Sequence, residues 1–449
     1  MTTIEVNFEQ SAGKIKAMHA TGQPPFGGGF LQLNFTPMQY LKDAGVPYCR
    51  LHDVGGAFGG NRFVDIPNIF RDFDADENNP ESYDFAFTDE LLKAMHEYGL
   101  KPIFRLGVTI ENQAHIKAYR INPPKDYHKW ARVCEHIVRH YNEGWANGFY
   151  FGITYWEIWN EPENGPTPTS NQMWTGTAQD YYRLYDITAK HLKSCFGDTI
   201  KVGGYGASGC YGIYYHPEKY GIQVPQKEKD ERYEKDIYRV EFFYGFVEYI
   251  KAHNSPIDFF SFHSYAGVEK TVVMSSFLHR VLREYGYGHL ETHLNEWNNA
   301  HELALFGKSY SSAQVTAMMC AMQNSQTDML FYYDTRIFAS PYCGLFNAYT
   351  RKPCCTYYCF IAFNELYKLG TQVQCVCDND RVYAVGATNG EENAVLIVNT
   401  GEDTTVNTNL LGAYKAYLLD EDNFLTEQDL SVNEFKLKSN QVVLLKKAV

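Results

Sequence analysis

Eight short runs rich in β-branched and aromatic residues recur between residues 26 and 334, with longer segments between them. Three of these segments, residues 84–99, 125–142 and 312–325, carry apolar residues near i, i+3 and i+4, the spacing of an amphipathic helix. Strands that alternate with helices in this way predict an α/β fold, a closed (β/α)8 TIM barrel. The predicted barrel strands are residues 26–34, 46–51, 101–107, 152–160, 199–206, 256–265, 289–297 and 328–334.

After about residue 370 the pattern changes to short alternating strands separated by Gly, Asn and Asp, which predicts a small C-terminal β-sandwich. The N-terminal "TIEVNF" alternates in the same way and precedes the first barrel strand, so we expect it to join the sandwich. We therefore predict an N-terminal strand over residues 1–15, a catalytic barrel over 16–368 and an accessory β-sandwich over 369–449.

The charge and hydropathy of the chain limit the kinds of partner that we expect it to bind. The 449 residues include 40 Lys and Arg against 53 Asp and Glu, a net charge of −13. Nucleic acids and anionic membranes attract basic surfaces, so we expect neither, and a neutral or cationic ligand fits better. No apolar run has membrane-spanning length, and the polar start "MTTIEVNFEQ" does not resemble a signal peptide. We expect a cytoplasmic protein, unless a signal has been removed, and leave a homo-oligomer open.

Eleven cysteines, an odd number in scattered positions, suit a reducing compartment. Six of them gather in one region, at Cys343, Cys354, Cys355, Cys359, Cys375 and Cys377. Their spacing matches no standard zinc pattern, so we interpret them as small buried side chains, with a metal site as the alternative. The sequence has no HExxH motif and no phosphate-binding loop, so we expect neither metal nor cofactor.

Two glutamates end predicted strands at the same mouth of the barrel. Glu161 follows the fourth strand in "YWEIWNEPENGP", and Glu296 ends the seventh in "HLNEWNN". The carboxyl ends of barrel strands carry the chemistry in barrel enzymes. Paired carboxylates there suit hydrolysis of a glycosidic bond, in which one attacks the anomeric carbon or activates water and the other protonates the leaving oxygen.

These motifs resemble those of clan A glycoside hydrolases, in which a strand-four Asn-Glu is followed by a strand-seven Glu. Together with "YDFAFTDELLKAMHEYGLKPIFRLG" and the β-rich tail, they are most similar to glycoside hydrolase family 39, which holds β-xylosidases and α-L-iduronidases. The resemblance implies that Glu161 is the acid/base, Glu296 the nucleophile and Asn160 the amide that binds the sugar 2-hydroxyl. It implies a retaining mechanism, with carboxyl groups about 5–5.5 Å apart. We expect the negative nucleophile to raise the pKa of Glu161.

Further candidates stand at strand ends. Arg50 and His52 share a face of the second strand, and His263 and Tyr265 share a face of the sixth. We expect Arg50 to pair with Glu157, to keep Glu296 ionised, or both, and Tyr265 to orient Glu296. His52 and Tyr265 are expected to contact the sugar. His263 is either a sugar contact or a core histidine with its hydrogen bonds made.

Substrate contacts are also predicted near the seventh and eighth strands. Asp334 either accepts from sugar hydroxyls or caps a turn. Arg336 is the one strand-end cation that we expect to be available for a uronate. Rings that could stack on a sugar face are Trp297, Trp159, Phe58, Tyr332 and Tyr342.

The sequence therefore predicts a retaining, exo-acting β-xylosidase-like enzyme that takes a neutral sugar from short oligosaccharides. The strand-eight segment "YYDTRIF" lacks the Trp expected in β-xylosidases, which keeps other family 39 activities open, α-L-arabinofuranosidase-like or α-L-iduronidase-like. A catalytically silent carbohydrate-binding barrel is the alternative from another class. Hydrolysis of nitrophenyl glycosides by the wild type, and loss of that hydrolysis in Glu296→Ala, would distinguish an active enzyme from a silent barrel.

Overall fold

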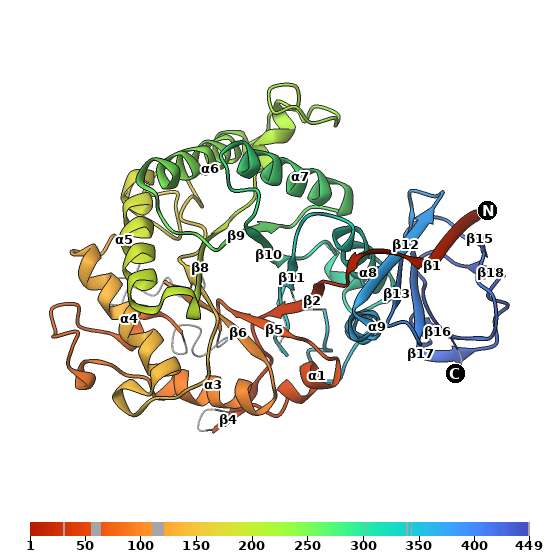
Figure 1. The fold of residues 1–449 in the computed structure, drawn as a ribbon, viewed down its shortest axis with the longest axis horizontal. Helices are drawn as coiled ribbons and strands as arrows, with labels where there is room; N and C mark the ends of the chain where they lie inside the picture. The colour runs from red at the N-terminus through yellow and green to blue at the C-terminus, as the bar shows by residue number, and fades with distance from the viewer. Residues whose placement is uncertain are drawn as a thin grey trace.

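Eight parallel strands close into a barrel, with helices around it (Figure 1). The computed structural model describes residues 1–29, 32–54, 64–109, 121–300, 302–337, 340–342 and 344–447. The hydrogen-bonded order is β10-β11-β2-β5-β6-β7-β8-β9, which confirms the predicted (β/α)8 barrel. The strands are β2 (Ala17–Gly22), β5 (Tyr48–Leu51), β6 (Lys101–Leu106), β7 (Tyr155–Ile158), β8 (Lys201–Ala207), β9 (Phe259–Ser264), β10 (Glu291–Trp297) and β11 (Met329–Tyr332).

The helices are α1 (Met38–Asp43), α2 (Ile66–Ile69), α3 (Ala86–Glu97), α4 (Tyr127–Glu143), α5 (Ala178–Phe196), α6 (Tyr233–His253), α7 (Val268–Glu284), α8 (Ser309–Gln323) and α9 (Cys355–Leu369). Three of them, α3, α4 and α8, coincide with the amphipathic segments predicted from the sequence. The Asp126 side chain caps α4 by accepting from the backbone N–H groups of His128 and Lys129, and Gly144, with φ 75°, ends it. Within the part of the chain that can be described, no helix has both the length and the apolar character needed to cross a bilayer.

The prediction that residues 26–34 form the first barrel strand is wrong. Gly27–Gly29 (β3) and Gln32–Asn34 (β4) pair with each other as a separate antiparallel hairpin. The barrel begins instead at β2, which lies between β11 and β5. Every residue of β2 is buried, so the strand shows no alternation in its sequence, "AMHATG". The run at residues 26–34 suggested a strand because its composition is apolar, but its glycines are weak strand formers.

The other strands form one nine-stranded sheet in the order β17-β16-β19-β14-β13-β12-β1-β15-β18. Strand β1 (Thr2–Lys14) pairs antiparallel with β12 (Thr371–Cys377) and parallel with β15 (Thr404–Thr408). The sheet surrounds its own apolar cluster, which includes Ile4, Val395 and Leu445, and this confirms the predicted β-sandwich. Its remaining strands are β13 (Val382–Thr388), β14 (Asn393–Asn399), β16 (Tyr414–Leu419), β17 (Phe424–Gln428), β18 (Glu434–Leu437) and β19 (Val442–Lys447).

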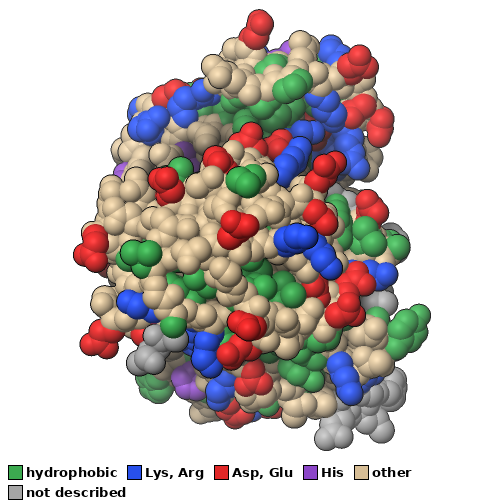
Figure 2. Space-filling view, turned by 90° about the vertical axis from the view of Figure 1, so that its right-hand side faces the viewer, with side chains coloured by type: hydrophobic (Ala, Val, Ile, Leu, Met, Phe, Trp, Pro, Cys, Tyr) green, Lys and Arg blue, Asp and Glu red, His purple; other side chains and the backbone are tan. Residues whose placement is uncertain are grey.

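One face of this sheet packs against α8 and α9 of the barrel. Val385 and Leu396 of the sheet belong to the same buried cluster as Phe360 and Phe363 of α9, so the hydrophobic core is continuous. The face turned away from the barrel carries acidic and basic side chains with apolar ones between them (Figure 2). Both chain ends lie at this side of the molecule (Figure 1).

The described members of the cysteine cluster lie on two elements, at the first turns of α9 and on β12. Cys355 and Cys359 are buried on α9, as expected for small core side chains. The half-buried members of the cluster are Cys354, Cys375 and Cys377. Cys343 lies outside the described residues.

Candidate active site

A pocket of about 800 Å³ opens at the carboxyl end of the barrel strands. Five of the predicted site residues line it: His52, Asn160, Glu161, Tyr265 and Glu296. One carboxylate oxygen each of Glu161 and Glu296 and a ring nitrogen of His263 all lie within 4.8 Å of one another. The barrel therefore brings together two glutamates that are 135 residues apart in sequence.

Glu161 enters the pocket because the chain turns sharply after β7. Trp159 and Glu161 have left-handed backbone conformations, with φ 73° and 45°. Such a conformation costs about 1–3 kcal/mol in a non-glycine residue and is concentrated at functional sites. The Glu161 N–H is held by the carbonyls of Tyr205 (3.2 Å) and Gly206 (3.1 Å) of β8. Pro162, which has no N–H, follows without leaving a donor unpaired.

Arg50 of β5 joins three acceptors beneath the pocket. Its Nε donates to Glu157 Oε2 (2.7 Å), and its Nη1 donates to Glu296 Oε1 (2.8 Å). Its Nη2 donates to Asn160 Oδ1 (2.6 Å). One guanidinium thus contacts both of the glutamates that were predicted as partners of Arg50. Since Asn160 uses its amide oxygen here, its NH₂ group is left to donate elsewhere.

Glu157 is a fully buried carboxylate under this network. Ser261 Oγ donates to its Oε1 (2.6 Å), and the Asn295 amide donates to the same oxygen. Burial raises the pKa of Glu157, but the charge of Arg50 and the hydrogen bonds from Ser261 and Arg50 lower it more. The sequence analysis did not identify Ser261 or Asn295, although Asn295 directly precedes Glu296 in "HLNEWNN".

Glu296 is oriented from two other sides. Tyr265 Oη donates to its Oε2 (2.9 Å), as predicted, and His52 Nε2 lies 3.8 Å from its Oε1. The register of β9 and β10 sets Glu296 directly beside His263. His52 Nε2 also lies 3.2 Å from Asp53 Oδ1, and Tyr333 Oη donates to Asp53 (2.6 Å). These contacts fix the carboxylate while leaving it accessible from the pocket.

His263 is the direct partner of Glu161. Its Nδ1 lies 2.8 Å from Glu161 Oε1 and, because an ionised carboxylate only accepts, Nδ1 is the donor. Burial lowers the pKa of His263, but the charges of Glu296 and Glu161 and the hydrogen bond raise it above its ordinary value. His263 thus lies under the carboxylates, whose charges favour its protonated form.

The expected rise in the pKa of Glu161 is wrong for this state of the protein. Burial does raise it, but the hydrogen bond and charge of His263, the charge of Arg239 and the amide of Asn164 together lower it to about 2. These opposite shifts favour the charged pair with the proton on His263, and the charge of Glu296 raises the pKa of the histidine further.

Glu163 is a second carboxylate that the sequence analysis missed, although it lies only two residues after Glu161. It is buried, and its Oε1 accepts from the Ser208 backbone N–H (2.6 Å) and hydroxyl (3.0 Å). Burial, with the charge of Glu161, raises the pKa of Glu163 to about 7. With this pKa, the Glu163 carboxyl keeps its proton at acidic pH. The side chain lies behind the wall of the pocket.

Three predicted substrate contacts lie elsewhere. Trp297 is fully buried and packs against Tyr332 at a centroid distance of 5.3 Å, so its ring offers no face to a sugar. Asp334 is also fully buried, and Arg336 Nε donates to it (2.8 Å). Neither Asp334 nor Arg336 is among the described residues that line the pocket. These contacts favour the alternative interpretation of Asp334 as a turn residue.

The aromatic wall of the pocket is made of tyrosines. Tyr342 lies 5.5 Å from Tyr265 and 5.2 Å from Tyr333 between ring centroids, and all three line the cavity. Of the rings proposed to stack on sugar, Tyr342 is therefore well placed. Trp159 belongs to the core with Tyr332, and Phe58 lies outside the described residues.

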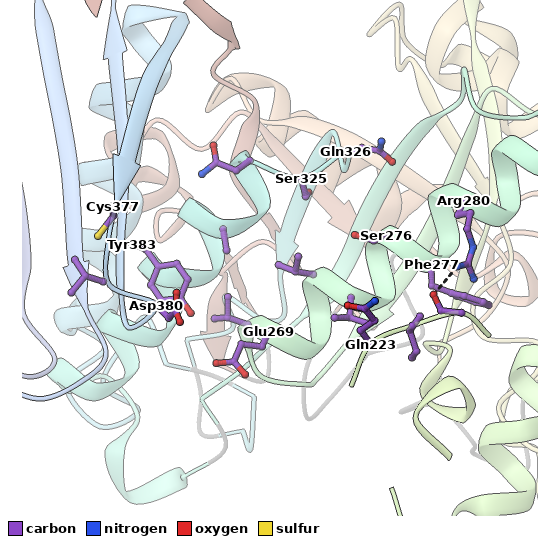
Figure 3. Close-up of a pocket in the computed structure, with 18 of the residues that line it drawn as sticks. Gln223, Glu269, Ser276, Phe277, Arg280, Ser325, Gln326, Cys377, Asp380 and Tyr383 are labelled. Carbon is purple, nitrogen blue, oxygen red and sulfur yellow. Dashed lines mark hydrogen bonds between the residues drawn. The ribbon is translucent and has the colours of Figure 1, made fainter. Parts of the chain in front are cut away.

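A larger groove of about 1250 Å³ lies between α7 and the β12–β13 hairpin, away from these carboxylates (Figure 3). Glu269 and Asp380 border it from its two sides (Figure 3). Its size alone does not make it the reaction site, since the paired acids lie in the smaller pocket.

Besides the Glu161–His263–Glu296 group, donor atoms of Glu135, His191 and Cys195 on α4 and α5 lie close enough to hold a metal ion.

Two enzymes of known activity resemble parts of this chain. A β-xylosidase from Caldicellulosiruptor saccharolyticus is 29% identical over 134 residues, 27% of this chain and 25% of that enzyme. A β-xylosidase from Geobacillus stearothermophilus is 25% identical over 154 residues, 32% of this chain and 29% of that enzyme. The matched stretches thus span only 25% and 29% of the length of these two relatives.

Solved structures share the fold over the whole chain. A glucosidase from Croceicoccus marinus has a TM-score of 0.74 at 19% identity, covering 100% of this chain and 99% of that one. A family 39 β-xylosidase from Caulobacter crescentus has a TM-score of 0.66 at 16% identity, covering 99% of both chains. The family model for glycosyl hydrolases family 39 matches residues 32–305. The chain therefore belongs to glycosyl hydrolases family 39.

Proposed function

We propose that this glycosidase is a retaining, exo-acting enzyme of the β-xylosidase type, which cleaves short oligosaccharides by double displacement. The separation of the two glutamates carries the proposal, since their nearest oxygens lie within 4.8 Å. Retaining enzymes hold their carboxyl groups about 5–5.5 Å apart, whereas inverting enzymes need about 6.5–9.5 Å to admit a water. The short separation supports direct attack by a carboxylate.

Glu296 is the nucleophile in this proposal. Arg50 and Tyr265 each bind one of its oxygens, which holds the carboxylate in place for attack on the anomeric carbon. The attack forms a glycosyl-enzyme ester while the bond to the leaving oxygen breaks. Water then attacks the same carbon and releases Glu296, so that two inversions give net retention. The NH₂ group of Asn160 is available to the sugar 2-hydroxyl.

Glu161 is the acid/base. Its proton comes from the His263–Glu161 pair, across the 2.8 Å between Nδ1 and Oε1. In the first step the proton moves to the leaving oxygen, and in the second Glu161 takes a proton from the attacking water. Asn164 Nδ2 donates to the other oxygen of Glu161 (2.6 Å), which fixes the carboxyl plane.

Support for a xylose-type sugar comes from the two related enzymes, both named β-xylosidases. Support for exo action on short chains comes from the pocket, whose 800 Å³ is within the ~300–1,000 Å³ typical of small-ligand sites. Arabinofuranosidase-like and iduronidase-like activities remain the alternatives within the family.

A panel of nitrophenyl glycosides tests the assignment, with the anomeric form of the first product followed by NMR. We expect β-xyloside to be the best substrate and the product to retain its configuration. Glu296→Gln should abolish turnover of every glycoside. Glu161→Gln should lose about 10²- to 10⁴-fold on poor leaving groups and far less on dinitrophenyl glycosides, which need no acid.

Glu269→Gln, in the groove between α7 and the sheet, is the matched control and should behave as wild type. A product of inverted configuration would overturn the retaining mechanism. Equal losses in Glu161→Gln for good and poor leaving groups would remove Glu161 from the role of acid.

A further inference from the structure

Basic side chains gather on one wall of the catalytic pocket. They come from the connection between β8 and α6, from α6 itself and from the start of α7, and they are Lys227, Arg232, Lys235, Arg239 and Lys270. The chain as a whole has a net charge of −13. A concentration of cations inside one pocket therefore opposes the charge of the molecule as a whole, and it is local charge that a bound ligand experiences most strongly.

Only part of this charge is neutralised by the protein. Lys227 pairs with Asp230 (2.7 Å), and Arg239 pairs with Asp236 (3.1 Å). Across the described ranges, Arg232, Lys235 and Lys270 have no carboxylate within 4.0 Å. Burial lowers the pKa of Lys235, and the charges of Arg239 and Arg232 lower it as well, whereas those of Glu161 and Asp236 raise it. An anion beside Lys235 would relieve its repulsion by the two arginines.

The basic wall lies on the side of the acid/base. Lys235 Nζ donates to Asn164 Oδ1 (3.4 Å), and Asn164 in turn donates to Glu161. In a glycosidase the acid lies beside the oxygen that leaves, so this wall faces the leaving group. Around Glu296, by contrast, the guanidinium of Arg50 is already bonded to three protein acceptors. Among the described residues that line the pocket, the sugar side thus offers an anion no comparable cation.

We propose that the leaving group of the natural substrate carries an anionic substituent, a carboxylate, phosphate or sulfate, which lies against Arg232, Lys235 and Lys270. The sugar held between the two glutamates is neutral. The inference rests on the proposed function, because it uses Glu161 as the acid to identify the leaving-group side. It differs from the expectation of a neutral or cationic ligand, which rested on the net charge of −13 and not on where the charges lie.

Matched substrates test the proposal. The glycone is the sugar that the nitrophenyl panel selects, linked to glucose, glucuronate, glucuronate methyl ester, glucose 6-sulfate or glucose 6-phosphate. We expect at least one anionic substrate to exceed glucose about tenfold or more in kcat/KM at low salt. The preference should shrink in about 0.5 M salt, where the Debye length falls to a few ångströms. The three anions distinguish carboxylate, phosphate and sulfate.

Single variants link the preference to the wall. Lys235→Gln, Arg232→Gln and Lys270→Gln should each reduce the ratio of anionic to neutral kcat/KM by about three- to tenfold, mainly through KM. Lys235→Arg keeps the charge and should keep most of the ratio. Lys219→Gln removes an exposed cation of the same connection outside the pocket and should leave the ratio unchanged. Equal ratios in the pocket variants and Lys219→Gln would overturn the proposal.

Binding of the leaving group alone separates this inference from the proposed mechanism. Calorimetry with glucuronate, glucose 6-sulfate or glucose 6-phosphate needs no turnover. Salt-sensitive binding that is lost in Lys235→Gln supports the anion site, even if the nitrophenyl panel removes Glu161 from the role of acid. No preference and no such binding by an enzyme that hydrolyses neutral glycosides with retention overturns the anion site and leaves the mechanism intact.

Discussion

Arg50 shows how one side chain can organise a site formed by several strands. Its guanidinium reaches Glu157, Glu296 and Asn160 at once, and its buried charge is balanced by the first two. Lysine has a single ammonium in place of the planar fork and cannot reproduce three contacts in these directions. The position therefore controls both the stability of the barrel interior and the placement of Glu296.

We expect Arg50→Met to lower the free energy of unfolding by about 3–5 kcal/mol, because it leaves buried carboxylates without a partner. The same change should lower kcat more than it raises KM, since the glutamate is displaced rather than the pocket wall. Urea unfolding and steady-state kinetics measure both. Arg280→Met, at a half-buried position outside the pocket, should cost far less, and equal costs at the two sites would contradict this account.

Glu163 makes a pH-dependent contribution to stability. The pKa of its carboxyl is raised from 4.5 to about 7, so the folded state retains a proton that the unfolded state loses. Stability from this group is complete below pH 4.5 and is lost as pH rises from 4.5 to 7. Glu163→Gln stays neutral, and its carbonyl can still accept from Ser208. Its stability relative to wild type should therefore rise by up to about 3 kcal/mol between pH 4.5 and 7.5.

Urea unfolding of wild type and Glu163→Gln across that pH range measures the difference, in which the titration of other groups largely cancels. Glu302→Gln, an exposed acid outside the pocket, should give a difference that does not change with pH. A flat difference for Glu163→Gln would mean that its carboxyl is ionised in the folded protein throughout.

At the scale of elements, the end of β8 must come close to the site. Gly206 has φ 61°, and a Cβ at this position would lie 3.1 Å from Arg50 Nη2 and Asn160 Oδ1 and 3.2 Å from His263 Nε2. The glycine is needed both for its left-handed backbone and for the close approach of β8 to these side chains. Its carbonyl also receives the N–H of Glu161.

Gly206→Ala should therefore lower stability by about 1 kcal/mol or more and reduce kcat/KM at least tenfold, because the new methyl group displaces Asn160 or His263. Thermal unfolding and nitrophenyl glycoside kinetics test this. Gly286→Ala provides a control: its φ is 95°, but a Cβ there would meet nothing within 4 Å, so only the backbone cost should appear. Loss of activity in both variants would argue against a specific contact at Gly206.

The sequence pattern predicted strands correctly where they form a clear apolar run. The runs at 46–51, 101–107 and 152–160 became β5, β6 and β7 because they combine β-branched and aromatic residues and are bounded by polar segments. β2 was not recognised because it is short and buried on both faces, with His19 and Thr21 inside the core. Burial of polar residues in a strand depends on partners that a local pattern does not contain.

At the scale of the whole molecule, the barrel and the sheet share one apolar core. Residues of β13, β14 and β19 belong to the same buried cluster as α8 and α9, and β1 crosses from the sheet into β2 of the barrel. We infer that the parts predicted as separate domains at residues 1–15, 16–368 and 369–449 unfold together.

Scanning calorimetry should show a single unfolding transition. A chain truncated after residue 369 should aggregate or unfold at a clearly lower temperature, since α8 and α9 would expose apolar surface to water. Lys446→Gln, which removes an ion pair between the sheet and Glu365 of α9 without removing apolar contacts, should change the transition only slightly. Two separate transitions in the full chain would contradict a shared core.

The sequence by itself determined the barrel, the β-rich tail, and the positions of Glu161, Glu296 and Asn160, because strand patterns and strand ends are local properties of the chain. It also identified Arg50 and Tyr265, which alternate on strands whose inward face could be inferred. Only the tertiary structure decided that Trp297 and Asp334 are buried, that His263 lowers the pKa of Glu161, and that Lys235 and its neighbours line the pocket. Burial, pKa values and local charge depend on groups distant in sequence, and only folding brings those groups within reach of one another.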